Sequence, residues 1–152
     1  MIQGQWFSPG KDISPLLPVR ESVFGRGADA LDGESWNTLV YEDDVPAASG
    51  RIWYRDGAYW LGDICVAESR RGRRLGDLVL RLLLFKAQSH AAPEVRLLCP
   101  SAVAGFFARL GFVSVSGPSG PDAETVEMAI DGARIDLDTC KHCPKSNCPD
   151  RR

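Results

Sequence analysis

Residues 69–77 read SRRGRRLGD, with four arginines and two glycines in nine positions. Before them, residues 58–67 form a strand-like run, and after them residues 76–90 form a leucine-rich segment whose polar side chains fall on one narrow stripe. This pattern predicts a β-strand that leads into a helix buried on most of its surface. The first N–H groups of a helix are unpaired and lie at the positive end of its dipole. A basic, glycine-rich junction there predicts an anion site, most naturally for phosphate; the alternative is a solvated basic turn.

The segments around this junction predict a mixed sheet. Strands are expected over residues 36–42, 47–55, 58–67 and 94–100. The Asp56-Gly57 pair is typical of a tight hairpin turn, and the helix over 76–90 joins two parallel strands in a βαβ unit. The remaining expected elements are a weak strand in 1–10, a helix in 12–24, a loop or short helix in 25–35, a helix in 101–112, and closing strands in 112–116 and 124–130.

Composition limits the partners. The chain has 152 residues, a net charge of -2 and a sequence pI of about 5.7. This balance argues against a nucleic-acid partner, so the basic junction acts locally. No apolar run approaches the ~18 residues that span a membrane, and the first residues lack the pattern of a secretory signal. We expect a cytoplasmic protein without a membrane partner, with one domain over 1–135 and a cysteine-rich tail over 136–152; the oligomeric state is open, a homodimer included.

Two motifs carry a resemblance to a known family. The junction is similar to the acyl-CoA-binding motif of the GNAT N-acetyltransferases, Arg/Gln-x-x-Gly-x-Gly/Ala after a strand that ends in Val; Val66, Arg71 and Gly76 match it. Residues 106–112, FFARLGF, resemble the second signature, aromatic-Tyr-x-x-Leu-Gly-Phe. The resemblance implies an α/β (α+β) fold. Its central sheet is mixed, mostly antiparallel and twisted, has about six to seven strands splayed between two parallel central strands, and is flanked by about four helices.

The resemblance implies acetyl-CoA as the co-substrate. Its pantetheine arm would bond to the backbone at Ile64 and Val66 like an added strand, and the Val66 N–H would polarise the acetyl carbonyl. Gly62 is the expected place for a bulge that bends this strand. The predicted cofactor-binding residues are Ile64, Cys65, Val66, Arg71, Gly72, Arg73, Arg74, Leu75, Gly76, Phe106 and Phe107.

Two residues depart from the family pattern. Arg74 stands where the family has its middle glycine, so the backbone there approaches the cofactor less closely, or the side chain turns toward the cofactor 3′-phosphate. Phe107 stands where the family usually has a tyrosine that often protonates the departing CoA thiolate. A thiolate with a reference pKa of ~8.5 is a fair leaving group and needs little help from an acid.

Asp63 is the first candidate for the base that takes a proton from the amine, through a water. It is expected on the strand face that carries Tyr59, Leu61 and Cys65, and a structural acid bonded to a neighbouring strand is an equal alternative. Cys99 and Ser101 are candidate proton donors in place of the tyrosine, with burial for packing as the alternative for Cys99. Weaker acidic candidates, each with a surface or turn role as the alternative, are Glu68, Asp43 and Asp44.

The tail carries a separate candidate site. Cys140, Cys143 and Cys148 with His142 supply three thiols and one imidazole, a set that suits zinc or another thiophilic metal. The alternative is a tail with free thiols. The leading functional hypothesis is an acetyl-CoA-dependent N-acetyltransferase that modifies a primary amine of a small molecule or protein by direct attack in a ternary complex. The alternative is a non-catalytic acyl-CoA-binding module whose tail senses metal or redox state.

Overall fold

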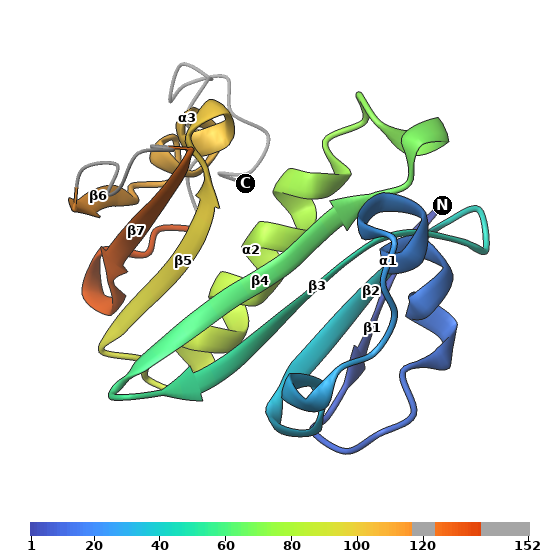
Figure 1. Ribbon diagram of the computed structural model, residues 1–152, viewed down its shortest axis with the longest axis horizontal. Coiled ribbons are helices and arrows are strands. Elements are labelled where there is room, and N and C mark those ends of the chain that lie inside the picture. The colour runs from blue at the N-terminus through green and yellow to red at the C-terminus, as the bar shows by residue number, and fades with distance from the viewer. Residues whose placement is uncertain (117–123, 138–152) are drawn as a thin grey trace.

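The computed structural model describes residues 1–116 and 124–137, and its centre is one seven-stranded sheet (Figure 1). The strands are β1 Ile2–Phe7, β2 Trp36–Glu42, β3 Val45–Arg55, β4 Ala58–Val66, β5 Glu94–Pro100, β6 Val113–Ser116 and β7 Thr125–Asp131. Their order across the sheet is β1-β2-β3-β4-β5-β7-β6. The helices of the described residues are α1 Leu17–Phe24, α2 Leu75–Ser89 and α3 Ala104–Ala108. None of these helices is both long and apolar enough to cross a membrane.

The predicted splayed sheet is confirmed. All neighbouring strands are antiparallel except β4 and β5, which are parallel. Their pairing is short, running from Tyr59 with Val95 to Leu61 with Leu97. Beyond these residues the two strands diverge, so the sheet opens as a V toward the carboxyl end of β4 (Figure 1). The rest of β4 therefore has a free backbone edge facing β5.

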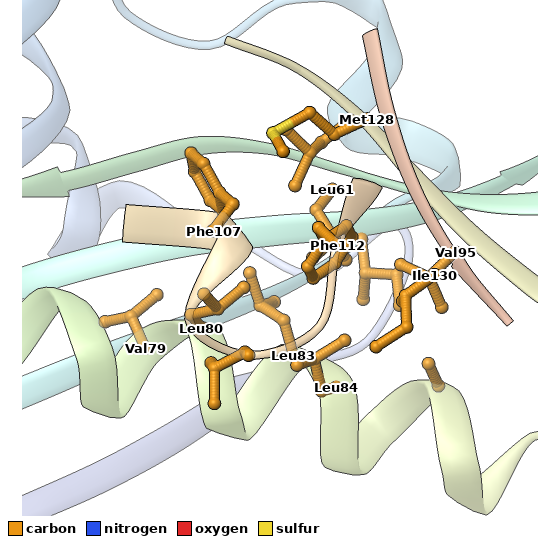
Figure 2. Packing of buried hydrophobic residues seen from close by; sticks show 14 of the residues in the cluster. Leu61, Val79, Leu80, Leu83, Leu84, Val95, Phe107, Phe112, Met128 and Ile130 are labelled. Carbon is orange, nitrogen blue, oxygen red and sulfur yellow. The ribbon is translucent and has the colours of Figure 1, made fainter. Parts of the chain in front are cut away.

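Helix α2 closely matches the helix predicted over 76–90. Its buried face carries Val79, Leu80, Leu83 and Leu84, which meet side chains from α3 and the sheet, including Phe112 after α3 (Figure 2). Gly50 of β3 allows the helix to lie close to this strand. A Cβ at this position would lie only 2.8 Å from a Val79 methyl carbon. This packing fixes the start of α2 beside the end of β4. The described residues hold three α-helices against about four expected, since 25–35 forms only the 3-10 helix Ala30–Glu34.

The hairpin between β3 and β4 has the predicted turn. Asp56 and Gly57 have φ angles of 52° and 83°, which places both in the left-handed region that a type I′ turn requires. This turn sets the start of the β3–β4 register, with Arg55 opposite Ala58.

The bulge in β4 lies one residue beyond the predicted position. Ser49 pairs with Cys65 and Arg51 with Gly62, so residues 63–64 together oppose one residue of β3. Asp63 has a φ of 53°, in the left-handed region. Gly62 has another role: a Cβ there would lie 2.9 Å from the Trp53 ring.

The bulge also corrects the predicted face of Asp63. An extra residue in one strand reverses the alternation of side chains beyond it. Tyr59 and Leu61 belong to the core that α2 covers, whereas Cys65 packs with Leu16 and Leu39 on the α1 side of the sheet. Asp63 lies on this second side, bonded to residues of α1 and the following loop, so it does not share a face with Tyr59 and Leu61.

Candidate active site

The free edge of β4 lines the cleft between β4 and β5. The Ala67 N–H donates to the Ala47 carbonyl at 2.8 Å, so it points toward β3. Because backbone groups alternate along a strand, the N–H and C=O of Val66 point the other way, into the cleft. The Arg71 Nε donates to this Val66 carbonyl at 3.2 Å. The Val66 N–H thus points into the cleft, where a ligand could accept from it, while the Val66 carbonyl already accepts from Arg71.

Two arginines of the junction are paired with a carboxylate. Arg70 and Arg73 both donate to Glu42 at the end of β2. The hydrogen bond from Arg70, together with that from Arg73, lowers the pKa of Glu42 despite the opposing effect of burial. Glu42 therefore offsets part of the local charge. Of the four arginines in the junction, Arg71 and Arg74 are the two that do not pair with Glu42, and both are exposed at the start of α2.

Arg74 occupies a backbone conformation that favours glycine. It is the N-cap residue of α2, with φ 62° and ψ 24°. A side chain in the left-handed region costs roughly 1–2 kcal/mol, because the Cβ approaches the following carbonyl oxygen. This explains physically why the GNAT motif has glycine here. Within the described residues, the exposed Arg74 side chain makes no hydrogen bond or ion pair.

Replacing Arg74 with glycine is expected to keep the fold and to raise its free energy of unfolding by up to about 1 kcal/mol. The relief of backbone strain exceeds the entropic cost of glycine in the unfolded chain. Urea unfolding followed by circular dichroism measures the change. The matched control is Arg73→Gly, which has no left-handed φ to relieve and loses an ion pair. If Arg74→Gly had a lower free energy of unfolding than Arg73→Gly, the backbone of Arg74 would not be strained as we infer.

Gly76 lies between the end of β4 and α3. A Cβ on Gly76 would lie 3.6 Å from a Val66 methyl carbon and 3.8 Å from the Phe106 ring, which are ordinary contacts. A longer side chain would press on both neighbours at the mouth of the cleft. Together, Val66, Arg71 and Gly76 place the strand edge, a cation and the start of α2 side by side.

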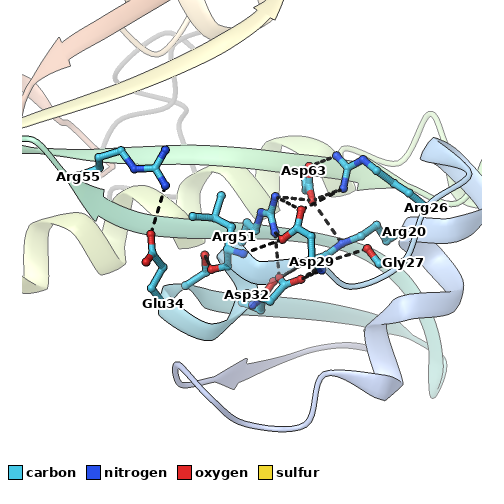
Figure 3. A network of polar contacts seen from close by, with 12 residues as sticks. Arg20, Arg26, Gly27, Asp29, Asp32, Glu34, Arg51, Arg55 and Asp63 are labelled. Atoms are coloured by element: carbon cyan, nitrogen blue, oxygen red, sulfur yellow. Dashed lines mark hydrogen bonds and ion pairs between the residues drawn. The ribbon is translucent and has the colours of Figure 1, made fainter.

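Asp63 is bound by three guanidinium groups (Figure 3). Arg26 donates to both of its carboxylate oxygens. The Arg20 Nε and an Arg51 terminal nitrogen lie 3.4 and 3.3 Å from one of these oxygens. The Asp63 side chain is 8% exposed. Its oxygens are thus already occupied, a setting that favours the structural alternative over a free base.

The Asp63 contacts belong to a larger buried network. Arg20 also donates to Asp32, at 2.8 and 3.0 Å, and to Asn37 at 3.0 Å. Arg51 donates to Asp32 and Asp29. The network joins α1, the 3-10 helix Ala30–Glu34 and strands β2, β3 and β4 (Figure 3). The sequence did not reveal the arginines of this network, because their partners lie on five separate elements and leave no local spacing pattern. The available signal was Arg51, a charged residue inside the largely apolar β3 segment.

Asp32 makes the network sensitive to acid. Burial would raise the pKa of Asp32, but hydrogen bonds from Arg20 and from the Asp29 N–H outweigh it and lower that pKa from 3.8 to about 2. Because the folded-state pKa lies below the unfolded-state value, this stabilisation is present above about pH 4 and is lost as the pH falls toward 2.

We therefore expect the free energy of unfolding to fall by on the order of 2 kcal/mol between about pH 4.5 and pH 2 on account of Asp32. Urea unfolding at a series of pH values measures this loss. An Asp32→Asn variant lacks the titrating group and should show a smaller acid loss. Equal losses in the two proteins would contradict the role assigned to Asp32.

The two candidate proton donors, Cys99 and Ser101, and Phe107, which stands in the place of the tyrosine, have different settings. The Cys99 thiol is buried against Met128, with the two sulfur atoms 3.9 Å apart, and burial raises its pKa. Phe107 is also buried and packs edge-on against Phe106 and Phe112. Ser101 is exposed at the end of β5. The structure therefore favours packing roles for Cys99 and Phe107 and leaves Ser101 accessible.

The weaker acidic candidates lie on the surface. Asp43 and Asp44 form the left-handed turn between β2 and β3, and Asp43 binds the amino terminus at 2.7 Å. Glu68 is exposed in a 3-10 turn after β4. In the ranges 1–116 and 124–137, no group of three or more His, Cys, Asp or Glu side chains is placed to hold a metal. The predicted metal ligands lie outside the described residues: Cys140, His142, Cys143 and Cys148.

Comparisons with known proteins agree with this geometry. A family model described as "Acetyltransferase (GNAT) domain" matches residues 34–114. The Bacillus subtilis (strain 168) protein "Uncharacterized N-acetyltransferase YjcF" is 28% identical over 110 residues, covering 67% of this chain and 79% of that protein. The crystal structure of an acyl-CoA N-acyltransferase from Pseudomonas aeruginosa has a TM-score of 0.75 at 20% identity, covering 85% of this chain and 99% of that one. A GNAT family acetyltransferase from Elizabethkingia anophelis, with acetyl-CoA bound, has a TM-score of 0.63 at 14% identity, covering 86% and 97%.

The family match runs from β2 to the start of β6 and so includes the splayed strands, the basic junction and both motifs. The chain belongs to the GNAT acetyltransferase family. It is accordingly an acyl-CoA N-acyltransferase of the N-acetyltransferase class. The resemblance and the fold implied by the two sequence motifs are confirmed.

Proposed function

We propose that the protein transfers an acetyl group from acetyl-CoA to a primary amine of a small molecule or a protein by direct attack in a ternary complex. The observation that carries this proposal is the free edge of β4 at Val66, which lies beside the start of α2 in the open V of the sheet. A ligand with both amide groups and phosphates suits this pairing, because amides extend a strand edge and phosphates bind the start of a helix.

Each part of the cofactor has a proposed place. The pyrophosphate would accept hydrogen bonds from backbone N–H groups of residues 71–76, supplemented by the Arg71 and Arg74 guanidinium groups. The pantetheine arm would run along β4 and bond at Ile64 and Val66. Phe106, which lies near Gly76, would border the arm from the α3 side. The structure with acetyl-CoA bound in a relative of the same fold supports this cofactor.

The reaction would begin when the amine nitrogen attacks the acyl carbon. The new C–N bond forms, the C–S bond breaks, and the CoA thiolate leaves with the electron pair. The Val66 N–H would stabilise the negative charge that develops on the acyl oxygen. We assign the proton lost by the amine to water at the cleft mouth, because the oxygens of Asp63 already accept from guanidinium groups. Ser101 is the proposed accessible donor to the thiolate, and water returns the proton to the Ser101 oxygen.

The test is the release of CoA thiol from acetyl-CoA in the presence of amines of different classes: peptide α-amines, lysine side chains, polyamines and amino sugars. We expect at least one class to give turnover above the hydrolysis measured without amine. Tight acetyl-CoA binding with no turnover on any amine would contradict the enzyme and favour the non-catalytic module. The cytoplasmic location, the homodimer and the metal site of the tail stay predictions from the sequence.

A further inference from the structure

Arg26 connects the loop after α1 to the strand that lines the cleft. It follows Gly25, the left-handed residue that ends α1. Its guanidinium carbon lies 5.1 Å from the Phe24 ring centroid, and its two terminal nitrogens donate to the two oxygens of Asp63 (Figure 3). The Arg26 side chain is 47% exposed, whereas Arg20 and Arg51 are 1% and 6% exposed. Arg26 is thus the outermost of the three cations on Asp63.

The residue that Arg26 holds has an unfavourable backbone conformation. Asp63 has a φ of 53°, and a single left-handed residue costs free energy unless its surroundings maintain it. It is the first of the two residues that oppose Gly50 in the bulge. A bulge bends its strand, and this one includes Ile64 and lies just before Val66. The ion pairs of Asp63 therefore fix the strand segment whose backbone faces the cleft.

We propose that Arg26 is a positioning residue for acyl-CoA. Its pair with Asp63 holds the β4 bulge, and the bulge sets the direction of the backbone groups at Ile64 and Val66 that receive the pantetheine arm. This inference rests on the proposed function and assigns Asp63 a positioning role as well. The start of α2 has an anchor of its own, because Leu75, the first residue of the helix, is buried in the core cluster that also contains Phe107 and Phe112.

A loss of Arg26 should therefore affect the two parts of the cofactor differently, whereas a general loss of stability would affect both alike. Loss of the Arg26 pair should weaken the bonds of the pantetheine arm and leave the phosphate contacts intact. Adenosine 3′-phosphate 5′-diphosphate, the nucleotide part of CoA, reports on the phosphate and nucleoside contacts without the pantetheine arm. Acetyl-CoA reports on both sets of contacts.

The experiment is calorimetric titration of both ligands into the wild type, Arg26→Ala, Arg26→Lys and Asp63→Asn. For Arg26→Ala we expect acetyl-CoA affinity to fall about tenfold, as when one or two backbone hydrogen bonds are weakened, with nucleotide affinity unchanged. Asp63→Asn should show the same pattern, and Arg26→Lys should recover part of the loss. The matched control is Arg55→Ala, which removes an exposed ion pair with Glu34 and should change neither affinity.

The outcomes separate this inference from the proposed function. A wild type that binds neither ligand contradicts the proposed function itself. A wild type that binds both, with Arg26→Ala binding both equally well or losing both equally, overturns the positioning role of Arg26. Unchanged acetyl-CoA affinity in Asp63→Asn, together with loss of turnover, overturns it as well, because a general base is then the better account of Asp63.

Discussion

Replacing Arg20 with alanine is expected to lower the free energy of unfolding by about 3–5 kcal/mol, the cost of breaking a buried ion pair by removing one partner. Arg20 is fully buried and binds Asp32 through two hydrogen bonds. It also binds Asn37 and lies within ion-pair distance of Asp63. The variant leaves these groups in a buried site that water does not reach freely, with Arg51 as the remaining buried cation.

Urea unfolding of Arg20→Ala measures this loss. Arg55→Ala is the matched control, because it deletes the same side chain from an ion pair in which both partners are more than half exposed. Exposed pairs contribute little, so its unfolding free energy should change by less than about 1 kcal/mol. A loss in Arg20→Ala no larger than that in Arg55→Ala would contradict the importance of the buried network.

The combined Arg71→Ala and Gly76→Glu substitution is expected to reduce acetyl-CoA affinity by at least about 100-fold. The glutamate places a negative charge and a long side chain at the start of α2, where the phosphates would bind. Its neighbours there are Val66 and the Phe106 ring. The alanine removes the cation next to the Val66 carbonyl. The fold should survive, because a carboxylate in the first turn is favourable for a helix.

Calorimetric titration of acetyl-CoA, with circular dichroism to confirm folding, measures this effect. The matched control is Gly33→Glu combined with Arg55→Ala, which makes the same two types of change at exposed positions. A Cβ on Gly33 meets nothing within 4 Å. The control should bind acetyl-CoA like the wild type. Equal affinity in the test variant and the control would place the phosphate site elsewhere.

The framework of this fold could be predicted from local sequence patterns. The Asp56-Gly57 turn, the α2 helix and the parallel strands around it each depend on residues close in sequence. The basic junction was predicted to lie at a helix start for the same reason. Arg74 shows the limit of this reasoning, because the motif marked it as unusual, but only the left-handed φ of 62° explains why.

The Asp63 environment could not be predicted in this way. Strand alternation assumes two residues per repeat, so an extra residue at 63–64 reverses every later assignment of a face. The partners of Asp63 lie 43, 37 and 12 residues before it in the chain, on α1, the following loop and β3 respectively. Folding alone brings these charges together, and their pairing favours the structural role among the two that the sequence left open for Asp63.

We propose above that acyl-CoA binds along the open edge of β4 and at the start of α2. Titration of acetyl-CoA into isotopically labelled protein, followed by amide chemical shifts, tests it most directly. We predict that the largest shifts occur at Val66 and at residues 71–76, with small shifts on the opposite edge of the sheet at β1. No binding, or shifts that leave Val66 and residues 71–76 unchanged, would contradict the account.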